Sequence, residues 1–392
     1  MEARTAHSLE LMTRFAGRTG VTGARPPRRY LWTDAFAVCN LLGLERATGE
    51  GRHRELALRL VDSVHHTLGR YRPEDSRTGW LSGLSEEEGE IHPTRGGLRI
   101  GKSLPERGPG ESMDERLEWD RDGQYFHYLT KWMHALDQAT RATGQPIFNA
   151  WAQELAHVAH RAFTYTPRSS ARKRMYWKMS TDLSRPLVRS MGHHDPLDGF
   201  VTCAELATTA RATGADATRP ALAEETAEFA SMIEVGALST ADPLGLGGLL
   251  VDAFRVEQLI EEGALAKNDG LLGALLGAAL AGLRHYVQQP DLRLPADHRL
   301  AFRELGLAIG FSAFGLMDGD ARRTPERFAG NPDLRSLLTQ LMRYTSLRVD
   351  IETFWLRPEH RQTRSWVEHQ DINEVMLATS LAPEGFLVIR AM

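Results

Sequence analysis

The sequence predicts an all-α protein in which helices follow one another as hairpins. Apolar residues recur with helical spacing from Ala6 to Ala382 of the 392-residue chain, and no Ser/Gly-rich or Pro-rich tract interrupts them. The tetrapeptide Arg-Ala-Thr-Gly occurs three times, at 46–49, 141–144 and 211–214, each time at the end of an apolar segment. Glycine just past a helix suits a helix C-terminus because it accepts the left-handed conformation, and arginine in the last turn faces the negative end of the helix dipole. Three similar helix-turn-helix units are therefore expected.

Successive helices differ in how much of their surface is apolar. The segment 31–44 is apolar on nearly every side, as expected for a helix buried all round, whereas 53–68 carries one apolar stripe and a charged opposite face. The same alternation of an inner and an outer helix returns along the chain. The further pairs are 122–143 with 147–163, 198–213 with 219–233, 244–262 with 271–288, and 300–317 with 334–349; the last inner helix, 371–381, pairs with the N-terminal segment 6–16.

Twelve helices in six pairs fit a closed (α/α)6 toroid better than an open array, whose ends would need capping repeats. Because no linker divides the pattern, a single domain over residues 1–392 is expected. Strands are expected only as minor elements. Segments 80–84 and 98–100 could pair within one insertion, and 385–389 resembles a strand.

Composition excludes several classes of function. A formal net charge of -4 argues against a nucleic-acid partner, and no uncharged apolar run is long enough to cross a membrane. The start of the chain lacks a basic and apolar leader, so we expect a cytoplasmic protein. Cys39 and Cys203 lie in apolar helical segments and suggest buried thiols rather than a disulfide framework or a zinc site. Neither a metal nor a cofactor is expected, and the oligomeric state stays open.

Three long connections follow outer helices, at 71–121, 165–197 and 350–370, and the alternating chain direction places them on one rim with the inner-helix N-termini. Compact domains rarely keep such long loops without a use, although tolerated insertions are the alternative. Seven of the eight tryptophans fall in these loops or early in inner helices. Aromatic rings pack on the C–H faces of sugars. The candidate ring contacts to a substrate are Trp32, Trp119, Tyr125, Trp177 and Trp366.

Basic side chains gather in the same loops. Arginine and lysine there would favour an anionic sugar, because they match carboxylate and phosphate groups, whereas solvated surface charge is the plain alternative. The candidates for substrate binding are Arg95, Arg99, Lys131 and Lys178, together with the acidic Asp34 at the start of the first inner helix.

The inner helices open on polar clusters that could carry acid and base chemistry. Two carboxylates that face each other across a sugar can hydrolyse a glycosidic bond, and inversion needs them roughly 6.5–9.5 Å apart. Asp122 and Asp198 form the leading pair, and the segment from Asp198 to Cys203 resembles the segment from Asp34 to Cys39. Glu118, Asp120 and Asp371 are substitutes, and helix capping is the structural alternative for each aspartate.

Histidines near inner-helix starts form a rival set, namely His127, His194 and His369. A neutral imidazole can move a proton at a sugar carbon next to a carbonyl, because its ordinary pKa lies near neutral pH. None of these histidines shows the two-histidine helical spacing of a metal site. The histidines therefore favour proton transfer over metal binding.

In size, helix alternation, hairpin turns and a tryptophan-rich rim, the chain resembles the (α/α)6-toroid sugar enzymes. The resemblance is to two groups, the single-domain N-acylglucosamine 2-epimerases and the unsaturated glucuronyl hydrolases. It implies catalytic histidines similar to His127, His194 and His369 in the first case, and paired aspartates similar to Asp122 and Asp198 in the second.

The function expected first is a glycoside hydrolase acting on a small or oligomeric sugar, in which Asp122 protonates the leaving oxygen and Asp198 activates water. A sugar 2-epimerase or isomerase and a non-catalytic glycan-binding protein are the alternatives.

Overall fold

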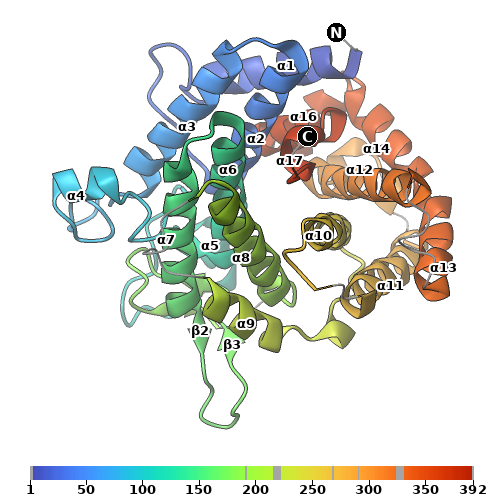
Figure 1. Ribbon diagram of the computed structural model, residues 1–392. Coiled ribbons are helices and arrows are strands. Elements are labelled where there is room, and N and C mark those ends of the chain that lie inside the picture. The colour runs from blue at the N-terminus through green and yellow to red at the C-terminus, as the bar shows by residue number, and fades with distance from the viewer. Residues whose placement is uncertain are drawn as a thin grey trace. The chain divides into compact units, whose positions relative to one another are not determined.

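The computed structural model describes residues 3–189, 192–214, 222–266, 269–289, 291–323 and 331–390. The chain forms two compact units, each an assembly of helices with few strands (Figure 1). Unit 1 comprises Met1–Phe15, Arg46–Gly49 and Glu234–Met392, and unit 2 comprises Ala16–Glu45 and Glu50–Ile233.

Unit 2 is built mainly from three helix hairpins. They join α2 (Leu31–Thr48) to α3 (Arg52–Leu68), α6 (Phe126–Thr143) to α7 (Pro146–Phe163), and α8 (Asp195–Ala212) to α9 (Ala223–Met232). Helix α6 packs against both α7 and α8, as Figure 1 shows. The long connection between α3 and α6 holds the short helices α4 (Glu86–Ile91) and α5 (Glu115–Asp120).

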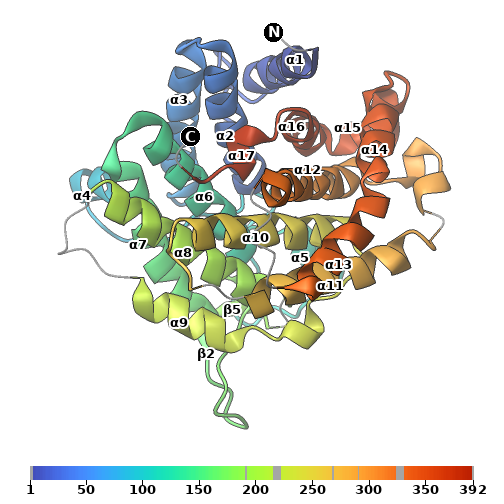
Figure 2. The same ribbon diagram turned by 45° about the vertical axis from the view of Figure 1, so that its right-hand side comes forward.

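Five short strands lie in the loops of unit 2. The strands are β1 (Gln124–Tyr125), β2 (Thr164–Tyr165), β3 (Arg174–Met175), β4 (Lys178–Met179) and β5 (Pro186–Val188). One sheet has the order β1-β4-β5, with Tyr125 opposite Lys178 in an antiparallel register. Strands β2 and β3 form a separate hairpin that projects from the helices in Figures 1 and 2. The first sheet therefore fixes the loop before α8 against the start of α6.

Unit 1 holds the remaining helices. They are α1 (Ala3–Arg18), α10 (Pro243–Glu261), α11 (Asp269–Tyr286), α12 (Ala301–Arg323), α13 (Pro332–Leu341), α14 (Ser346–Leu356), α15 (Arg364–Glu368), α16 (Gln370–Leu381) and α17 (Glu384–Leu387). Short 3-10 turns occupy Val235–Ala237, Asp291–Arg293, Ala296–His298, Met342–Tyr344 and His360–Gln362. Helix α12 packs against α10, α14 and α16, while α11 packs against α10 and α13.

The alternation of inner and outer helices is confirmed. Every residue of α2 from Leu31 to Leu42 is buried, whereas α3 buries a stripe with helical spacing. The three Arg-Ala-Thr-Gly segments lie at the ends of α2, α6 and α8, and their glycines have φ values of 73° at Gly49, 70° at Gly144 and 63° at Gly214. The Gly144 N–H donates to the Thr140 carbonyl, as a left-handed C-terminal turn requires.

Several expected boundaries are wrong, for identifiable reasons. Helix α6 begins at Phe126 rather than 122, because residues 124–125 pair as β1 and Gly123 has a φ of 143°. The expected helix 334–349 is split into α13 and α14 by the turn Met342–Tyr344. Residues 219–221 of the expected helix 219–233 lie outside the described residues.

The strand expectations at 80–84, 98–100 and 385–389 are also wrong. The Arg99 and Ile100 amides donate to Leu68 and Gly123 rather than to segment 80–84, where Trp80 forms an isolated bridge with Arg70. Residues 384–387 form helix α17 instead of a strand. Short apolar runs suit either a strand or a buried turn of helix, so periodicity alone does not separate them.

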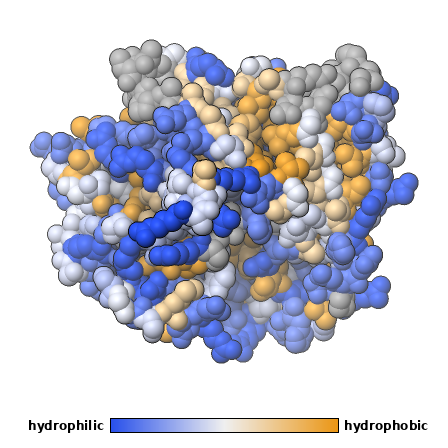
Figure 3. Space-filling model, turned by 90° about the horizontal axis from the view of Figure 1, so that it is seen from below, coloured by the Kyte–Doolittle hydropathy of each residue, from blue (hydrophilic) through white to orange (hydrophobic). Residues whose placement is uncertain are grey.

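No helix within the described ranges combines the length and apolar character that a membrane crossing needs. The face of the molecule drawn in Figure 3 is mostly hydrophilic, with apolar residues gathered in one part of it. Cys39 and Cys203, both within the described residues, are buried and form no disulfide bond, as expected.

Candidate active site

A row of aromatic rings lies beside the N-termini of α6 and α8 in unit 2. We call Trp119, Trp177, Tyr125, His127 and Trp32 the aromatic row. The Trp119 and Trp177 centroids are 4.9 Å apart, and Trp177 lies 5.1 Å from Tyr125. The His127 ring stacks on Trp177 at 6.2 Å and 13° and meets Trp32 at 6.1 Å. Trp119 is 53% exposed and Trp32 only 8%, so the row runs from the surface into the protein.

Local backbone structure positions this row. Strand pairing sets Tyr125 opposite Lys178, which brings the neighbouring Trp177 to the start of α6. The Trp177 N–H donates to the Val188 carbonyl of β5. Two further tyrosines flank the row, with the Tyr30 and Tyr128 hydroxyls 2.6 Å apart. Burial raises the pKa of Tyr30 to about 12, so its hydroxyl stays protonated at neutral pH.

Two aspartates lie one helical turn apart at the start of α8, and their surroundings differ. Asp195 is the first residue of the helix and is 4% exposed, and its Oδ2 has no hydrogen-bond partner among the described residues. Burial and the nearby Asp198 raise the pKa of Asp195 well above the usual range of an aspartate. The protonated form of Asp195 is therefore favoured over a wider pH range than that of an ordinary aspartate.

Asp198, by contrast, is held as a carboxylate by cationic and hydroxyl donors. The Lys131 Nζ lies 2.8 Å from each carboxylate oxygen, and the Thr130 hydroxyl donates to Oδ2 at 2.5 Å. Two carboxyl groups on one helix turn with such different surroundings are an arrangement that can separate an acid from a base or nucleophile.

His127 lies next to this pair in its neutral form. Its Nδ1 is 3.9 Å from Asp195 Oδ1, and no hydrogen-bond partner for that nitrogen occurs in the described part of the chain. Burial, assisted by the Lys131 charge, lowers the pKa of His127 to about 4. The imidazole can therefore accept or relay a proton without first losing one.

Asp122, the expected partner of Asp198, is instead enclosed by donors. The Gly101 and Gly123 amides donate to Oδ1 at 3.0 and 3.1 Å, and Arg99 Nη1 donates to Oδ2 at 2.5 Å. Arg99 is buried and also donates to the Arg70 and Thr67 carbonyls. This ion pair fastens the loop around 99–101 to the segment before α6, so the Asp122 carboxylate has no open side for a substrate.

Glu118 and Lys178 are similarly engaged with the loop. Lys178 Nζ is 3.0 Å from the Glu118 carboxylate and donates to the Glu118 and Arg121 carbonyls, while Arg107 Nε donates to Glu118 at 3.1 Å. Burial lowers the pKa of Lys178, against the opposing effect of Glu118. Asp120 is exposed. Glu118 and Lys178 therefore hold this loop together, whereas the Asp120 side chain is left on the surface.

The other expected residues of unit 2 have roles or positions apart from the contacts of Asp195 and Asp198. Asp34 is buried in the first turn of α2, accepts the Tyr30 N–H at 2.9 Å and lies 3.4 Å from the buried Arg29 guanidinium. Arg95 is exposed, with its nearest carboxylate, Glu154, at 3.8 Å. His194 is half-buried and immediately precedes α8.

Three expected residues belong to unit 1. Trp366 is buried with its centroid 5.6 Å from that of Trp355. His369 is exposed and packs edge-on against Phe302 at 5.6 Å, and Asp371 is the second residue of α16. The residues that unit 2 itself brings together are therefore the aromatic row, Lys131 and Asp198.

Asp195 is the candidate residue that sequence reasoning did not select. Its sequence signal was present, because a residue three positions before Asp198 shares its helix face. An aspartate at a helix start, however, is usually a cap, and only the structure shows that this carboxyl group is buried with an oxygen left over.

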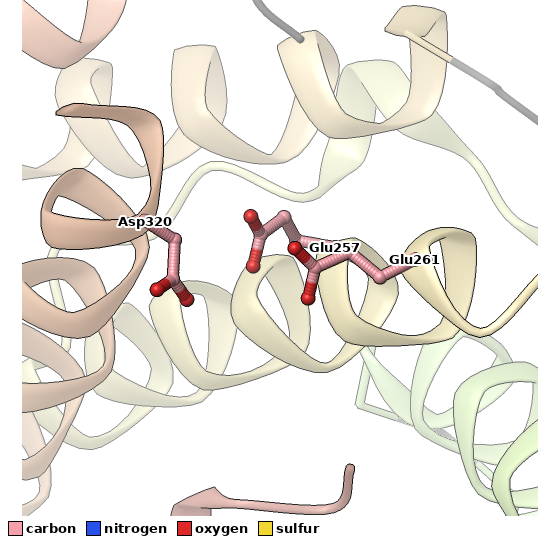
Figure 4. A group of neighbouring side chains, drawn as sticks. All are labelled: Glu257, Glu261 and Asp320. Atoms are coloured by element: carbon pink, nitrogen blue, oxygen red, sulfur yellow. The ribbon is translucent and has the colours of Figure 1, made fainter. Parts of the chain in front are cut away.

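Among the described residues, one group could in principle hold a metal ion. Oxygen atoms of Glu257, Glu261 and Asp320, in α10 and α12 of unit 1, lie within 4.8 Å of one another (Figure 4). Arg390 places one guanidinium nitrogen 2.8 Å from Glu261 and the other 2.8 Å from Asp320. Arg390 therefore pairs with two of the three carboxylates.

The chain is similar to known proteins in structure but not in sequence. No protein-family model matches it, and no curated protein is similar to it in sequence. The GH76 alpha-mannanase of Bacteroides thetaiotaomicron superimposes with a TM-score of 0.56 at 8% identity, over 98% of this chain and 96% of the mannanase. A polysaccharide lyase reaches 0.44 at 13% identity, over 96% of each chain. An unsaturated glucuronyl hydrolase specific for heparin reaches 0.33 at 13% identity, over 71% of this chain and 82% of the hydrolase.

The similarity to the mannanase extends over nearly the whole of both chains. It confirms the fold class expected from the alternating helix pairs: the chain has the (α/α)6-toroid fold.

Proposed function

We propose that this protein is a glycoside hydrolase whose general acid is Asp195 and whose charged carboxylate is Asp198. The observation that carries the proposal is the contrast between the two side chains. Asp195 is buried with one oxygen unpartnered in the described part of the chain, whereas Asp198 is bound by Lys131. The fold, shared with a mannanase, is compatible with this chemistry.

In the first step Asp195 would donate its proton to the glycosidic oxygen as the bond to the anomeric carbon breaks. The electron pair of that bond leaves with the oxygen, which becomes the hydroxyl of the released sugar. Positive charge then develops at the anomeric carbon, and the Asp198 carboxylate, one helical turn away, would stabilise that charge. The assignment gives the acid role to Asp195 instead of Asp122, because the Asp122 oxygens are committed to Arg99 and backbone amides.

The stereochemical outcome follows from the spacing of the two carboxyl groups. Residues three apart on a helix have Cβ atoms about 5–6 Å apart. Retaining hydrolases hold their carboxyl groups close, at roughly 5–5.5 Å, and two side chains on one helix turn favour such a short separation; we therefore propose retention, in which Asp198 attacks the anomeric carbon and Asp195 then activates water.

The aromatic row would hold the sugar rings. Trp119 is exposed and Trp177 and His127 are half-buried, so a chain entering at Trp119 would reach Asp195 past Trp177 and His127. We propose an oligosaccharide substrate, because a single sugar would leave the exposed Trp119 ring unused. Each aromatic ring offers an apolar face to one sugar ring.

A neutral glycan fits this site better than the anionic sugar expected from sequence. Arg99, Lys131 and Lys178 each have a carboxylate partner in unit 2, namely Asp122, Asp198 and Glu118. Their charges are balanced within the protein. An anionic substrate would therefore have to compete with an existing ion pair.

The proposal is tested by incubating the protein with a panel of neutral and uronate-containing polysaccharides and measuring new reducing ends. We expect turnover of at least one neutral glycan, loss of that turnover in Asp195→Asn, and retention in the matched variant Asp120→Asn, whose carboxylate is exposed. Full turnover by Asp195→Asn would overturn the assignment of the acid.

A second candidate, sugar epimerisation, is favoured by one observation. His127 is neutral and its Nδ1 lies 3.9 Å from Asp195, so the two could exchange a proton at a carbon next to a carbonyl. Epimerisation in deuterium oxide would place deuterium at that carbon of a recovered free sugar, whereas hydrolysis leaves the carbon-bound hydrogens in place. Deuterium incorporation without new reducing ends would favour the epimerase.

A further inference from the structure

Unit 1 contains a cavity of about 350 Å³ at the N-termini of α10 and α12. The C-terminal end of α11 contributes Tyr286 and Gln289 to its wall, and the loop before α12 contributes His298 and Leu300. Ala241 and Pro243 add apolar surface next to Leu300. The volume lies at the lower end of the range for small-molecule sites, about 300–1,000 Å³.

Two donor groups in this wall are buried without a partner. The Tyr286 hydroxyl and the Arg303 Nε have no hydrogen-bond acceptor among the residues that the structure describes. Tyr286 is 1% exposed, and burial raises its pKa, so the phenol remains a donor. A buried donor without an acceptor costs free energy, and an acceptor on a ligand would remove that cost.

The rest of the wall is already fixed. Asp242 caps α10 through the Gly245 N–H at 2.9 Å and binds Arg303 Nη1 at 2.5 Å. The Glu304 carboxylate accepts two bonds from Arg299, at 2.8 and 2.6 Å, and one from the Trp355 indole at 2.8 Å. The polar side chains around the two unpartnered donors are therefore held in place by contacts within unit 1.

Charge decides the class of ligand. The arginines at 299 and 303 face three carboxylates, those of Asp242, Asp291 and Glu304, so the wall carries no excess of positive charge. A phosphate or carboxylate would meet net negative charge, whereas a neutral hydroxylated molecule would not. Hydroxyl groups can accept from Tyr286 and Arg303 and donate to Asp242 or Gln289, while the C–H face of a sugar suits Pro243 and Leu300.

We propose that this cavity binds one neutral sugar unit, as a site of unit 1 in addition to the acid pair of unit 2. The proposal is independent of the catalytic assignment, since none of the residues in this wall takes part in the proposed reaction. Its occupant is a monosaccharide or the end of a glycan chain.

Methyl-labelled protein allows the two sites to be read separately by NMR. Ala241 and Leu300 report on the cavity, and Leu197, between the two aspartates of α8, reports on unit 2. The probes are methyl α-mannoside, methyl β-glucoside, methyl β-galactoside and glucuronate, each titrated into the full chain. We expect at least one neutral glycoside to shift the Ala241 and Leu300 signals in a saturable way.

Three variants make the test specific. Tyr286→Phe removes only the hydroxyl, and Arg303→Lys removes Nε while keeping a cation next to Asp242. Each should weaken binding about tenfold, the effect of one lost hydrogen bond in a buried site. The matched variant Tyr344→Phe, in a 3-10 turn outside the cavity, should bind as the parent does.

Three results would overturn the proposal. They are no shift of Ala241 and Leu300 with any neutral glycoside, unchanged affinity in both Tyr286→Phe and Arg303→Lys, or tighter binding of glucuronate than of methyl glucoside. A shift confined to Leu197 would refute the cavity and leave the catalytic proposal intact.

Discussion

Replacing Asp122 by asparagine separates the structural role of this residue from a catalytic one. The side chain is fully buried and accepts from three backbone amides and from Arg99, which is itself only 5% exposed. Asparagine has the same shape but no charge. Its amide nitrogen would face either the guanidinium or a backbone N–H, both of which are donors.

The expected loss of stability is large. Removing one partner of a buried ion pair leaves the other charge uncompensated, which costs about 3–5 kcal/mol. The Arg99 guanidinium would keep only its two carbonyl acceptors, those of Arg70 and Thr67. We therefore expect Asp122→Asn to lower the free energy of unfolding by several times the effect of Asp120→Asn, whose exposed side chain serves as the control.

The assay is urea unfolding followed by tryptophan fluorescence, with turnover measured on the folded protein below the transition. A double variant, Asp122→Asn with Arg99→Gln, should recover part of the lost stability, because it removes the unpaired charge. Our interpretation fails if Asp122→Asn unfolds at the parent's urea concentration and has nevertheless lost all turnover, since Asp122 would then be the acid.

Further outcomes follow from the same contacts. Asp195→Asn should raise the thermal unfolding midpoint at neutral pH. The pKa of Asp195 is raised in the folded state, so the parent protein loses stability as the pH rises from the unfolded-state pKa toward the folded-state pKa. The difference in midpoint between the variant and the parent should therefore shrink toward about pH 4. Thermal unfolding across pH checks this, and a lower midpoint at pH 7 would contradict it. Trp119→Ala should raise KM for long oligosaccharides by about tenfold and leave that for the shortest substrate unchanged, as expected for loss of one stacking ring; equal effects on both lengths would argue against an extended binding row. Burial raises the pKa of the Cys203 thiol, so it should react with a thiol reagent only after unfolding, and rapid labelling of the native protein would show that the thiol is accessible. Gly144→Ala should destabilise the protein by about 1 kcal/mol in urea unfolding, because the φ of 70° is strained for any residue with a Cβ; an unchanged midpoint would contradict this.

The helices could be predicted because their signals are local. Periodicity marks the buried and exposed faces, and glycine with arginine marks the ends at 49, 144 and 214. The short segments 80–84, 98–100 and 385–389 could not be predicted, since their backbone partners are distant in sequence. For example, the Ile389 N–H donates to the Gln258 side chain, and the Ile100 N–H donates to Gly123.

The place of the site could be predicted better than its chemistry. The starts of α6 and α8 do carry aromatic rings and aspartates, as the alternation of long and short connections indicates. Asp122 and Asp195 differ in the hydrogen-bond partners of their carboxyl groups. Arg99 and Gly101, some twenty residues before Asp122, satisfy one carboxylate, while the other is left buried with an unpartnered oxygen in the described part of the chain. Such a difference depends on how a loop folds back, which no local pattern encodes.

The central assignment is tested most directly by the dependence of each aspartate variant on the leaving group. Once a glycan is turned over, the natural bond and the dinitrophenyl glycoside of the same sugar are compared. Asp195→Asn should cleave the natural bond about 10²–10⁴-fold more slowly than the parent does. It should cleave the dinitrophenyl glycoside at nearly the parent's rate, because that leaving group needs no proton. Asp198→Asn should lose activity on both. Equal losses on the two substrates in Asp195→Asn, or full activity on the natural bond, would contradict the role of Asp195 as the acid.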